Sequence, residues 1–155
     1  MGSLRQLVGS PAVNPLLGYL SRPRTDPDVE RVALVEDVAH LERVDPHAIV
    51  LLTDAAAASA SSYRFDMALR VARSREVAAI VLPSGHAESV TPTAAAIAAR
   101  SGIAILATAG TPDIAELAIA IAREIAGAGT EHGAPARQRA QVRRVEVEGH
   151  AARLA

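Results

Sequence analysis

The sequence predicts a single three-layer α/β domain with a mostly parallel sheet, followed by a helical C-terminal tail. Three short apolar runs, residues 48–52, 77–82 and 103–106, alternate with stretches of helical periodicity. Uninterrupted apolar runs of this length are typical of parallel strands that are buried on both faces. Strands that alternate with helices imply right-handed crossovers and a parallel sheet, while the order of the strands in the sheet is not readable from the sequence. The chain of 155 residues is long enough for one domain with its own hydrophobic core.

The N-terminal part of the chain carries weaker signals. Residues 3–8 are predicted as a short helix capped by Ser3. Residues 9–28 contain several glycines and prolines, which predicts loop or short turns. Residues 29–35 first alternate between apolar and polar side chains and then become continuously apolar, which predicts a first strand with one exposed face. Residues 36–44 are expected to form a turn or a short helix.

Capping signals set the ends of the later helices. One helix is predicted over residues 59–73, where apolar residues recur at helical spacing. Thr91-Pro92 and Thr111-Pro112 each combine a side-chain N-cap with proline at the first helical position. The helix after Thr91 should end at Gly102, because glycine suits the left-handed conformation that follows many helices. The helix after Thr111 should run to about residue 126.

The C-terminal end of the chain changes in character. Residues 127–136 are predicted as a linker rich in glycine, alanine and proline, and residues 137–155 as a helical tail. Four small or apolar residues of the tail recur at helical spacing among arginines, namely Val142, Val145, Gly149 and Ala152. This apolar seam is too narrow to stabilise an isolated helix, so the tail is expected to pack against another protein surface. We expect a homodimer in which Val142 and Val145 contribute to self-association.

Composition excludes several classes of site and partner. The chain has no cysteine, which excludes disulfides, thiolate metal sites and cysteine nucleophiles. All 16 basic residues are arginine, so lysine chemistry is excluded as well. The net charge is −1 and residues 1–130 show no basic cluster, which argues against direct contact with nucleic acid. No apolar run is long enough for a membrane span and no signal peptide is visible, so a cytoplasmic protein is expected.

Motifs of catalysis and cofactor binding are also missing. The predicted layers are Rossmann-like, yet the chain contains neither G-x-G-x-x-G nor the phosphate-binding loop G-x-x-x-x-G-K-[ST]. Ser84 lacks the G-x-S-x-G frame of a nucleophile elbow. The five histidines are scattered, with no pair at helical spacing that would hold a metal. We therefore expect a non-catalytic domain with no cofactor and no metal.

Polar residues follow the apolar runs and define a candidate site. In open parallel sheets, small ligands bind outside the carboxyl ends of the strands. Helix N-termini expected at Ser59, Thr91 and Thr111 lie at the same edge, with free amides that suit an anion. The candidate ligand-binding residues at this edge are Thr53, Asp54, Ser84, Gly85, His86, Thr108 and Gly110.

Simpler interpretations of these residues remain open. Thr91 and Thr111 are common helix caps, and Ser84-Gly85 is a common turn. Asp54 can cap the turn that follows it. His86 can be a solvent-exposed loop residue.

The order of these pieces resembles the N-terminal domain of the PucR family of purine-catabolism-type transcription regulators. The resemblance covers roughly residues 3–126, and the tail from 138 to 154 is similar to the connecting helix that follows this domain in the family. The pieces that carry it, in order, are residues 3–7, 32–37, 48–53, 77–81, 98–105 and 113–125.

The chain departs from the family pattern at two strand ends. Asp54 and four alanines replace the glycine that follows the threonine-ended strand, and Pro83-Ser84-Gly85-His86 replaces a frequent lysine and glycine. These departures lie where a ligand would bind. The resemblance therefore implies the fold of the family but does not identify a ligand.

The resemblance implies a signal-input domain that senses a ligand or binds a protein. It would act on a DNA-binding domain outside this chain, with a purine-related effector as the first expectation. It also implies that the chain ends where the rest of a regulator begins. Two alternatives remain at this point: an interaction or dimerisation module that has lost ligand binding, and a small α/β enzyme using Asp54, Ser84 and His86.

Overall fold

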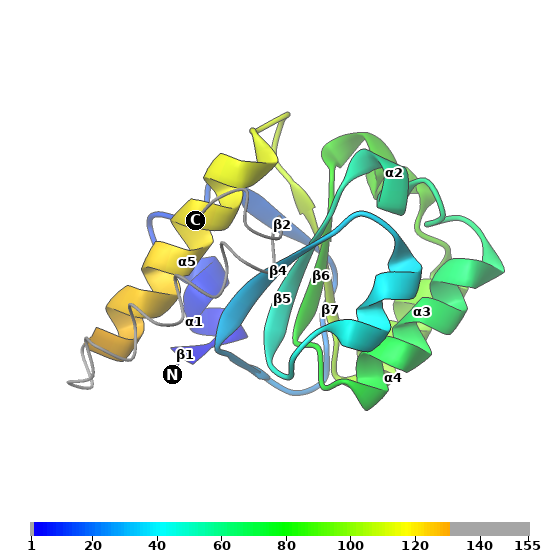
Figure 1. Ribbon diagram of the computed structural model, residues 1–155, viewed down its shortest axis with the longest axis horizontal. Coiled ribbons are helices and arrows are strands. Elements are labelled where there is room, and N and C mark those ends of the chain that lie inside the picture. The colour runs from blue at the N-terminus through cyan, green and yellow to red at the C-terminus, as the bar shows by residue number, and fades with distance from the viewer. Residues whose placement is uncertain (1, 131–155) are drawn as a thin grey trace.

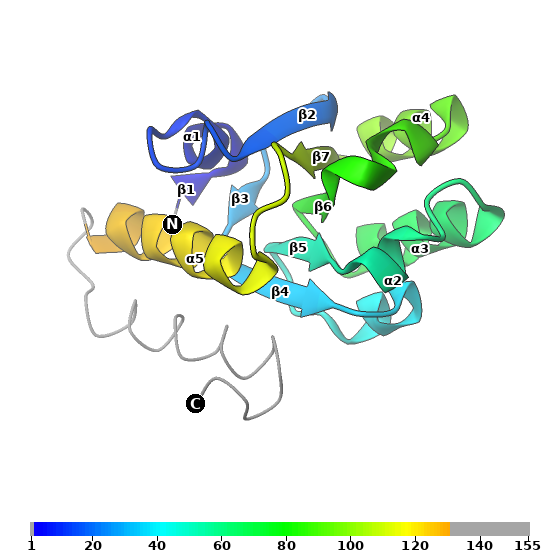
Figure 2. The same ribbon diagram turned by 90° about the horizontal axis from the view of Figure 1, so that it is seen from above.

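The computed structural model describes residues 2–130 and confirms the three-layer α/β fold (Figure 1). A five-stranded sheet has the order β2-β7-β6-β5-β4, and helices cover both of its faces (Figure 2). Its strands are β2 (Leu17–Ser21), β4 (Arg31–Val35), β5 (Ala48–Leu52), β6 (Ala79–Leu82) and β7 (Ala104–Thr108).

The remaining elements surround this sheet. Two short strands, β1 (Gly2–Ser3) and β3 (Asp28–Val29), pair antiparallel beside it. The α-helices are α1 (Leu4–Gly9), α2 (Asp54–Ala57), α3 (Tyr63–Ser74), α4 (Pro92–Ser101) and α5 (Ile114–Thr130), and the 3-10 helices are η1 (Val38–Arg43) and η2 (Ser84–Ser89).

The three apolar runs form parallel strands, as predicted, and the structure shows that these strands are neighbours in the sheet. Each strand from β4 to β7 pairs with the next one along the chain. Their carboxyl ends therefore lie at one edge of the sheet, in chain order. That edge carries the candidate site.

One strand of the five-stranded sheet was missed, since residues 9–28 were expected to be loop and turns. They contain β2, which pairs antiparallel with β7 and places Tyr19 opposite Leu106. The register shifts between Tyr19 and Ser21, and the flanking prolines stand outside the strand. An edge strand pairs on one side only, so nearby proline and glycine are tolerated there. The sequence pattern does not reveal pairing with a strand more than 80 residues later.

The expected exposed face of the first strand is wrong as well. All five residues of β4 are buried, including Arg31. Ala33 and Val35 face the apolar cluster that includes residues of η1, while Val32 and Leu34 face the cluster that includes α5. The long return of α5 across the sheet, visible in Figure 2, covers the face that the alternating pattern left open.

The sheet separates two apolar cores. One lies under η1, α3 and α4 and includes the single phenylalanine, Phe65, which is fully buried. The other lies under α1 and α5 and includes Leu4 and Ile121. With few aromatic side chains, these cores are built of Ala, Val, Ile and Leu.

Two of the predicted helix caps are confirmed. Ser3 Oγ accepts from the Gln6 amide at 3.2 Å, and the Gln6 side chain accepts in turn from the Ser3 amide at 3.2 Å. Thr91 Oγ1 accepts from the Ala94 amide at 3.0 Å, directly before Pro92. The same helix ends at Gly102 with φ 75°, as its sequence predicts.

The start of α3 differs from the prediction. The helix begins at Tyr63 and not at Ser59, because residues 59–62 form turns. Within these turns Ser59 Oγ donates to the Ala56 carbonyl at 2.9 Å, and Ser62 Oγ donates to the Ser59 carbonyl at 2.8 Å. Serine side chains that bond to nearby backbone compete with helix formation.

Both ends of α5 also differ from the prediction. The helix begins at Ile114, and its cap is Asp113 and not Thr111. Asp113 Oδ1 accepts from the amides of Ala115 at 2.8 Å and Glu116 at 3.2 Å. The helix continues through Thr130, into the stretch expected to be linker. Its last turns pack near β1, where a side chain added at Gly2 would lie 3.5 Å from Ala128 Cβ.

This corrected cap gives a testable prediction. Replacing Asp113 by alanine should lower the free energy of unfolding by about 1 kcal/mol, because two amides of α5 lose their acceptor. Thr111→Ala is the matched control and should change it by less than about 0.5 kcal/mol. Urea denaturation followed by circular dichroism measures both. Equal losses in the two variants would contradict the assignment of the cap.

The predicted tail, with its self-association residues Val142 and Val145, lies outside the described residues. Within residues 2–130, no helix is long and apolar enough to cross a membrane.

Candidate functional site

The carboxyl edge of the sheet holds a cavity of about 380 Å³. The ends of β5 and β6, the turn after β7 and the start of α5 form its walls. Six of the seven predicted ligand-binding residues line it, namely Thr53, Asp54, Ser84, Gly85, Thr108 and Gly110. The structure thus gathers residues from three segments of the chain at one place, while ligand binding itself stays a prediction.

Hydrogen bonds tie the end of β6 to the turn after β7. The Ser84 amide donates to Thr108 Oγ1 at 3.0 Å, and Ser84 Oγ donates to the Gly110 carbonyl at 2.8 Å. Thr108 Oγ1 lies 3.2 Å from the same carbonyl, to which it also donates. Gly110 has φ 72°, a conformation that favours glycine. Both hydroxyls therefore give their protons to the protein, and the lone pairs of Ser84 Oγ are left for a ligand that donates.

A contact between His86 and Asp54 lies at the rim of this cavity. His86, the seventh predicted residue, does not line the cavity, but its Nε2 lies 3.3 Å from Asp54 Oδ1. The Asp54 side chain is 86% exposed, so solvent screens the pair and its contribution to stability is small. The pair links the start of α2 to η2 across the mouth of the site. The carboxylate of Asp54 remains open to solvent and to a ligand.

The inner wall of the cavity is apolar. It comes partly from the strand ends, with Leu52 and Val81, and partly from α5, with Ile114 and Leu117. Sequence reasoning missed the contribution of α5. The helical periodicity of that segment marks an apolar face, but it does not show which edge of the sheet the helix reaches.

No cationic residue lines the cavity, and two of the three helix N-termini that were expected to suit an anion begin elsewhere than predicted. Ser59 does not begin a helix, and Thr53 caps α2 by accepting from the Ala56 amide at 3.3 Å. At α5, the amides of Ala115 and Glu116 bond to Asp113. The amides of Ala56, Ala115 and Glu116 are thus already bonded to side-chain oxygens. The one charged lining residue is the acid Asp54.

The simpler interpretations have mixed outcomes. Thr91 is a helix cap, but Thr111 is not. Asp54 is the first residue of α2 and not its cap. Ser84-Gly85 begins the 3-10 helix η2 and not a simple turn. The side chain of His86 is only 26% exposed, so it is not a free loop residue.

The arrangement of polar groups does not form a nucleophile–base pair. A serine nucleophile must pass its proton to a base. Ser84 Oγ donates to a backbone carbonyl, and within the described residues it forms no hydrogen bond with His86. Residues 2–130 likewise contain no group of three or more acidic or histidine side chains placed to hold a metal.

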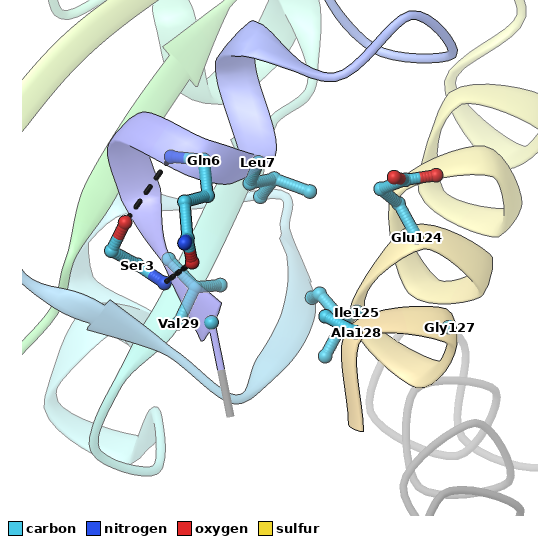
Figure 3. A pocket seen from close by; sticks show the side chains of 9 residues that line it. Ser3, Gln6, Leu7, Val29, Glu124, Ile125, Gly127 and Ala128 are labelled. Carbon is cyan, nitrogen blue, oxygen red and sulfur yellow. Dashed lines mark hydrogen bonds between the residues drawn. The ribbon is translucent and has the colours of Figure 1, made fainter. Parts of the chain in front are cut away.

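A second cavity, of about 340 Å³, lies between α1 and the C-terminal half of α5 (Figure 3). Figure 3 shows Ser3 and Gln6 bonded to each other on one wall and Glu124 on the opposite wall. The polar side chains of Ser3 and Gln6 are used by the cap of α1. None of the predicted ligand-binding residues lines this cavity.

Comparisons with known proteins do not show a family for this chain. No protein-family model and no curated protein matches the sequence. A solved structure of the CBS and DRTGG domains from the regulatory region of Clostridium perfringens pyrophosphatase, in complex with the activator diadenosine tetraphosphate, matches with a TM-score of 0.47. The two chains are 12% identical, and the match covers 79% of this chain but 46% of the other.

Proposed function

We propose that this chain is the non-catalytic signal-input domain of a PucR-type transcription regulator and binds a small effector at the carboxyl edge of its sheet. One observation carries the proposal: three strand ends converge on one cavity, and six of the residues predicted from their places after the strands line it. A cavity with an apolar wall and a few convergent polar groups is typical of a small-molecule site.

The lining residues favour a neutral effector that donates hydrogen bonds. Asp54 and the free lone pairs of Ser84 Oγ are acceptors, and no arginine or histidine lines the cavity. A phosphate would therefore meet a carboxylate without a compensating cation. No aromatic side chain lines the cavity, so stacking contributes nothing. Neutral purine bases and ureides, which carry several N–H donors, fit these requirements.

The walls of the cavity offer a route for the signal. Ile114 and Leu117 contact the cavity from the first turn of α5, and α5 runs to Thr130, where the described part of the chain ends. A ligand that contacts α5 in one position more than in another shifts the population of that position. The helix then transmits the change toward the C-terminal segment. DNA contact belongs to another part of the regulator.

A thermal-shift experiment with matched variants tests the proposal. Gly85 lines the cavity and has open space around it, so Gly85→Trp should fill the mouth without backbone strain. Gly18 on β2 has equally open surroundings away from the cavity, and Gly18→Trp is the control. Hypoxanthine and allantoin serve as neutral probes, and inosine 5′-monophosphate serves as an anionic probe.

A neutral probe at about 100 times its Kd should raise the Tm by roughly 5–10 °C in the original chain and in Gly18→Trp. The shift should vanish in Gly85→Trp, and inosine 5′-monophosphate should give none. A shift that survives in Gly85→Trp would place binding elsewhere. The absence of a shift with every probe would contradict effector binding and favour a module that works by protein contact.

A further inference from the structure

An apolar stripe runs along the outer face of α3. Five large apolar side chains are substantially exposed within the described residues, and three of them lie on this helix. Tyr63 is 71% exposed, Met67 is 58% exposed and Val71 is 37% exposed. They are four residues apart, so they form one ridge along the helix. The other two, Leu20 and Ile119, stand singly on β2 and α5.

A groove lies directly beside this ridge. It has a volume of about 290 Å³ and separates α3 from η1. Val38, Ala39 and Glu42 of η1 form one wall, and Arg64 and Ala68 belong to the wall on α3. Tyr63, Met67 and Val71 also line the groove, so the same face of the molecule carries the ridge and the groove side by side.

Two exposed charges mark opposite ends of the groove. Arg64 lies in the first turn of α3. Arg75 follows the last residue of α3, and its Nε donates to the Val44 carbonyl at 3.0 Å. Glu42 lies two residues before Val44 in the sequence. Glu42 thus belongs to the end of the groove where α3 finishes. Within the described residues, neither Glu42 nor Arg64 forms an ion pair.

We propose that a second copy of this chain docks on this face, related by a two-fold axis near Met67. The rotation seats the ridge of each copy in the groove of the other. It also exchanges the two ends of the groove, so that Arg64 of each copy meets Glu42 of the other. A two-fold interface requires a self-complementary surface, and a ridge beside a groove with opposite charges at its ends provides one.

The proposed interface is separate from the effector cavity. None of the residues that line the groove lines the cavity at the carboxyl edge. It also differs from the seam of Val142 and Val145 in the tail, which the sequence nominated for self-association. The location of the dimer contact can therefore be tested whether or not an effector binds.

The first test places a charge at the centre of the interface. Met67→Glu should raise the Kd of the dimer at least tenfold, because a carboxylate near the axis would face its own copy in the partner. Ile119→Glu makes the same change at a similarly exposed apolar residue on α5 and should leave the Kd unchanged. Sedimentation velocity of the full chain across a concentration series measures both, with circular dichroism as a check on folding.

The second test exchanges the charges at the ends of the groove. Glu42→Arg and Arg64→Glu should each weaken the dimer, since like charges then meet at both ends of the interface. The double variant should restore the original Kd within about threefold, because it only reverses the direction of each pair. Both positions are exposed, so these variants keep the fold even if Met67→Glu does not.

Loss of association in Met67→Glu together with rescue in the double exchange would establish the interface. A chain that stays monomeric at every concentration would overturn the proposal. A dimer that resists Met67→Glu and both single charge changes would also overturn it. If Val145→Glu alone then dissociated the dimer, self-association would belong to the tail.

Discussion

Replacing Phe65 by alanine is expected to lower the free energy of unfolding by about 3–5 kcal/mol. Phe65 is the largest of the fully buried side chains, and no other phenylalanine exists in the chain. It fills the space under η1, α3 and α4 among small and branched side chains. Alanine there leaves a cavity that short neighbours cannot reach, so the loss includes both apolar transfer and unfilled volume.

Phe65→Leu is the graded control for this prediction. Leucine keeps much of the volume and should cost roughly 1–2 kcal/mol, well below the cost of alanine. Urea denaturation at a fixed low protein concentration measures both variants without a contribution from self-association. A loss below about 1 kcal/mol in Phe65→Ala would contradict the close packing of this core.

Replacing Ile121 by alanine is expected to cost about 2–4 kcal/mol, because its side chain is fully buried between α5 and the sheet. Ile119, two residues earlier on the same helix, is 41% exposed, and Ile119→Ala should cost less than about 1 kcal/mol. This pair tests the packing of α5 across the sheet, since both variants change the same residue type in one helix. Similar losses in the two variants would contradict that packing.

Much of the fold could be predicted from the sequence because the decisive signals are local. The run Ala48–Leu52 forms β5 with the predicted bounds, since five apolar residues in sequence require burial on both faces. Thr91, Pro92 and Gly102 mark the ends of α4 through their own backbone and side-chain chemistry. The crossover rule then gives the handedness of the connections, while the order of the strands comes from the structure.

Predictions failed where a distant segment decides the outcome. Strand β2 forms because it pairs with the free edge of β7. The sequence around Leu17 contains no local signal for that pairing. Every residue of β4 is buried because α5 returns over it from the far end of the chain. Asp113 caps α5 in place of the predicted Thr111, because its carboxylate accepts from two helix amides at once. This makes Asp113 the stronger of two neighbouring N-cap candidates.

The sequence by itself determined the α/β class, the parallel strands and the residues that follow each strand, since these depend on local periodicity and on the geometry of parallel sheets. Only the tertiary structure decided what surrounds those residues. It brings Ile114 and Leu117 of α5 to the cavity, pairs His86 with Asp54, and uses the hydroxyls of Ser84 and Thr108 to bind a turn. These are contacts between segments far apart in the chain, and they depend on how helices cross a sheet, which periodicity does not encode.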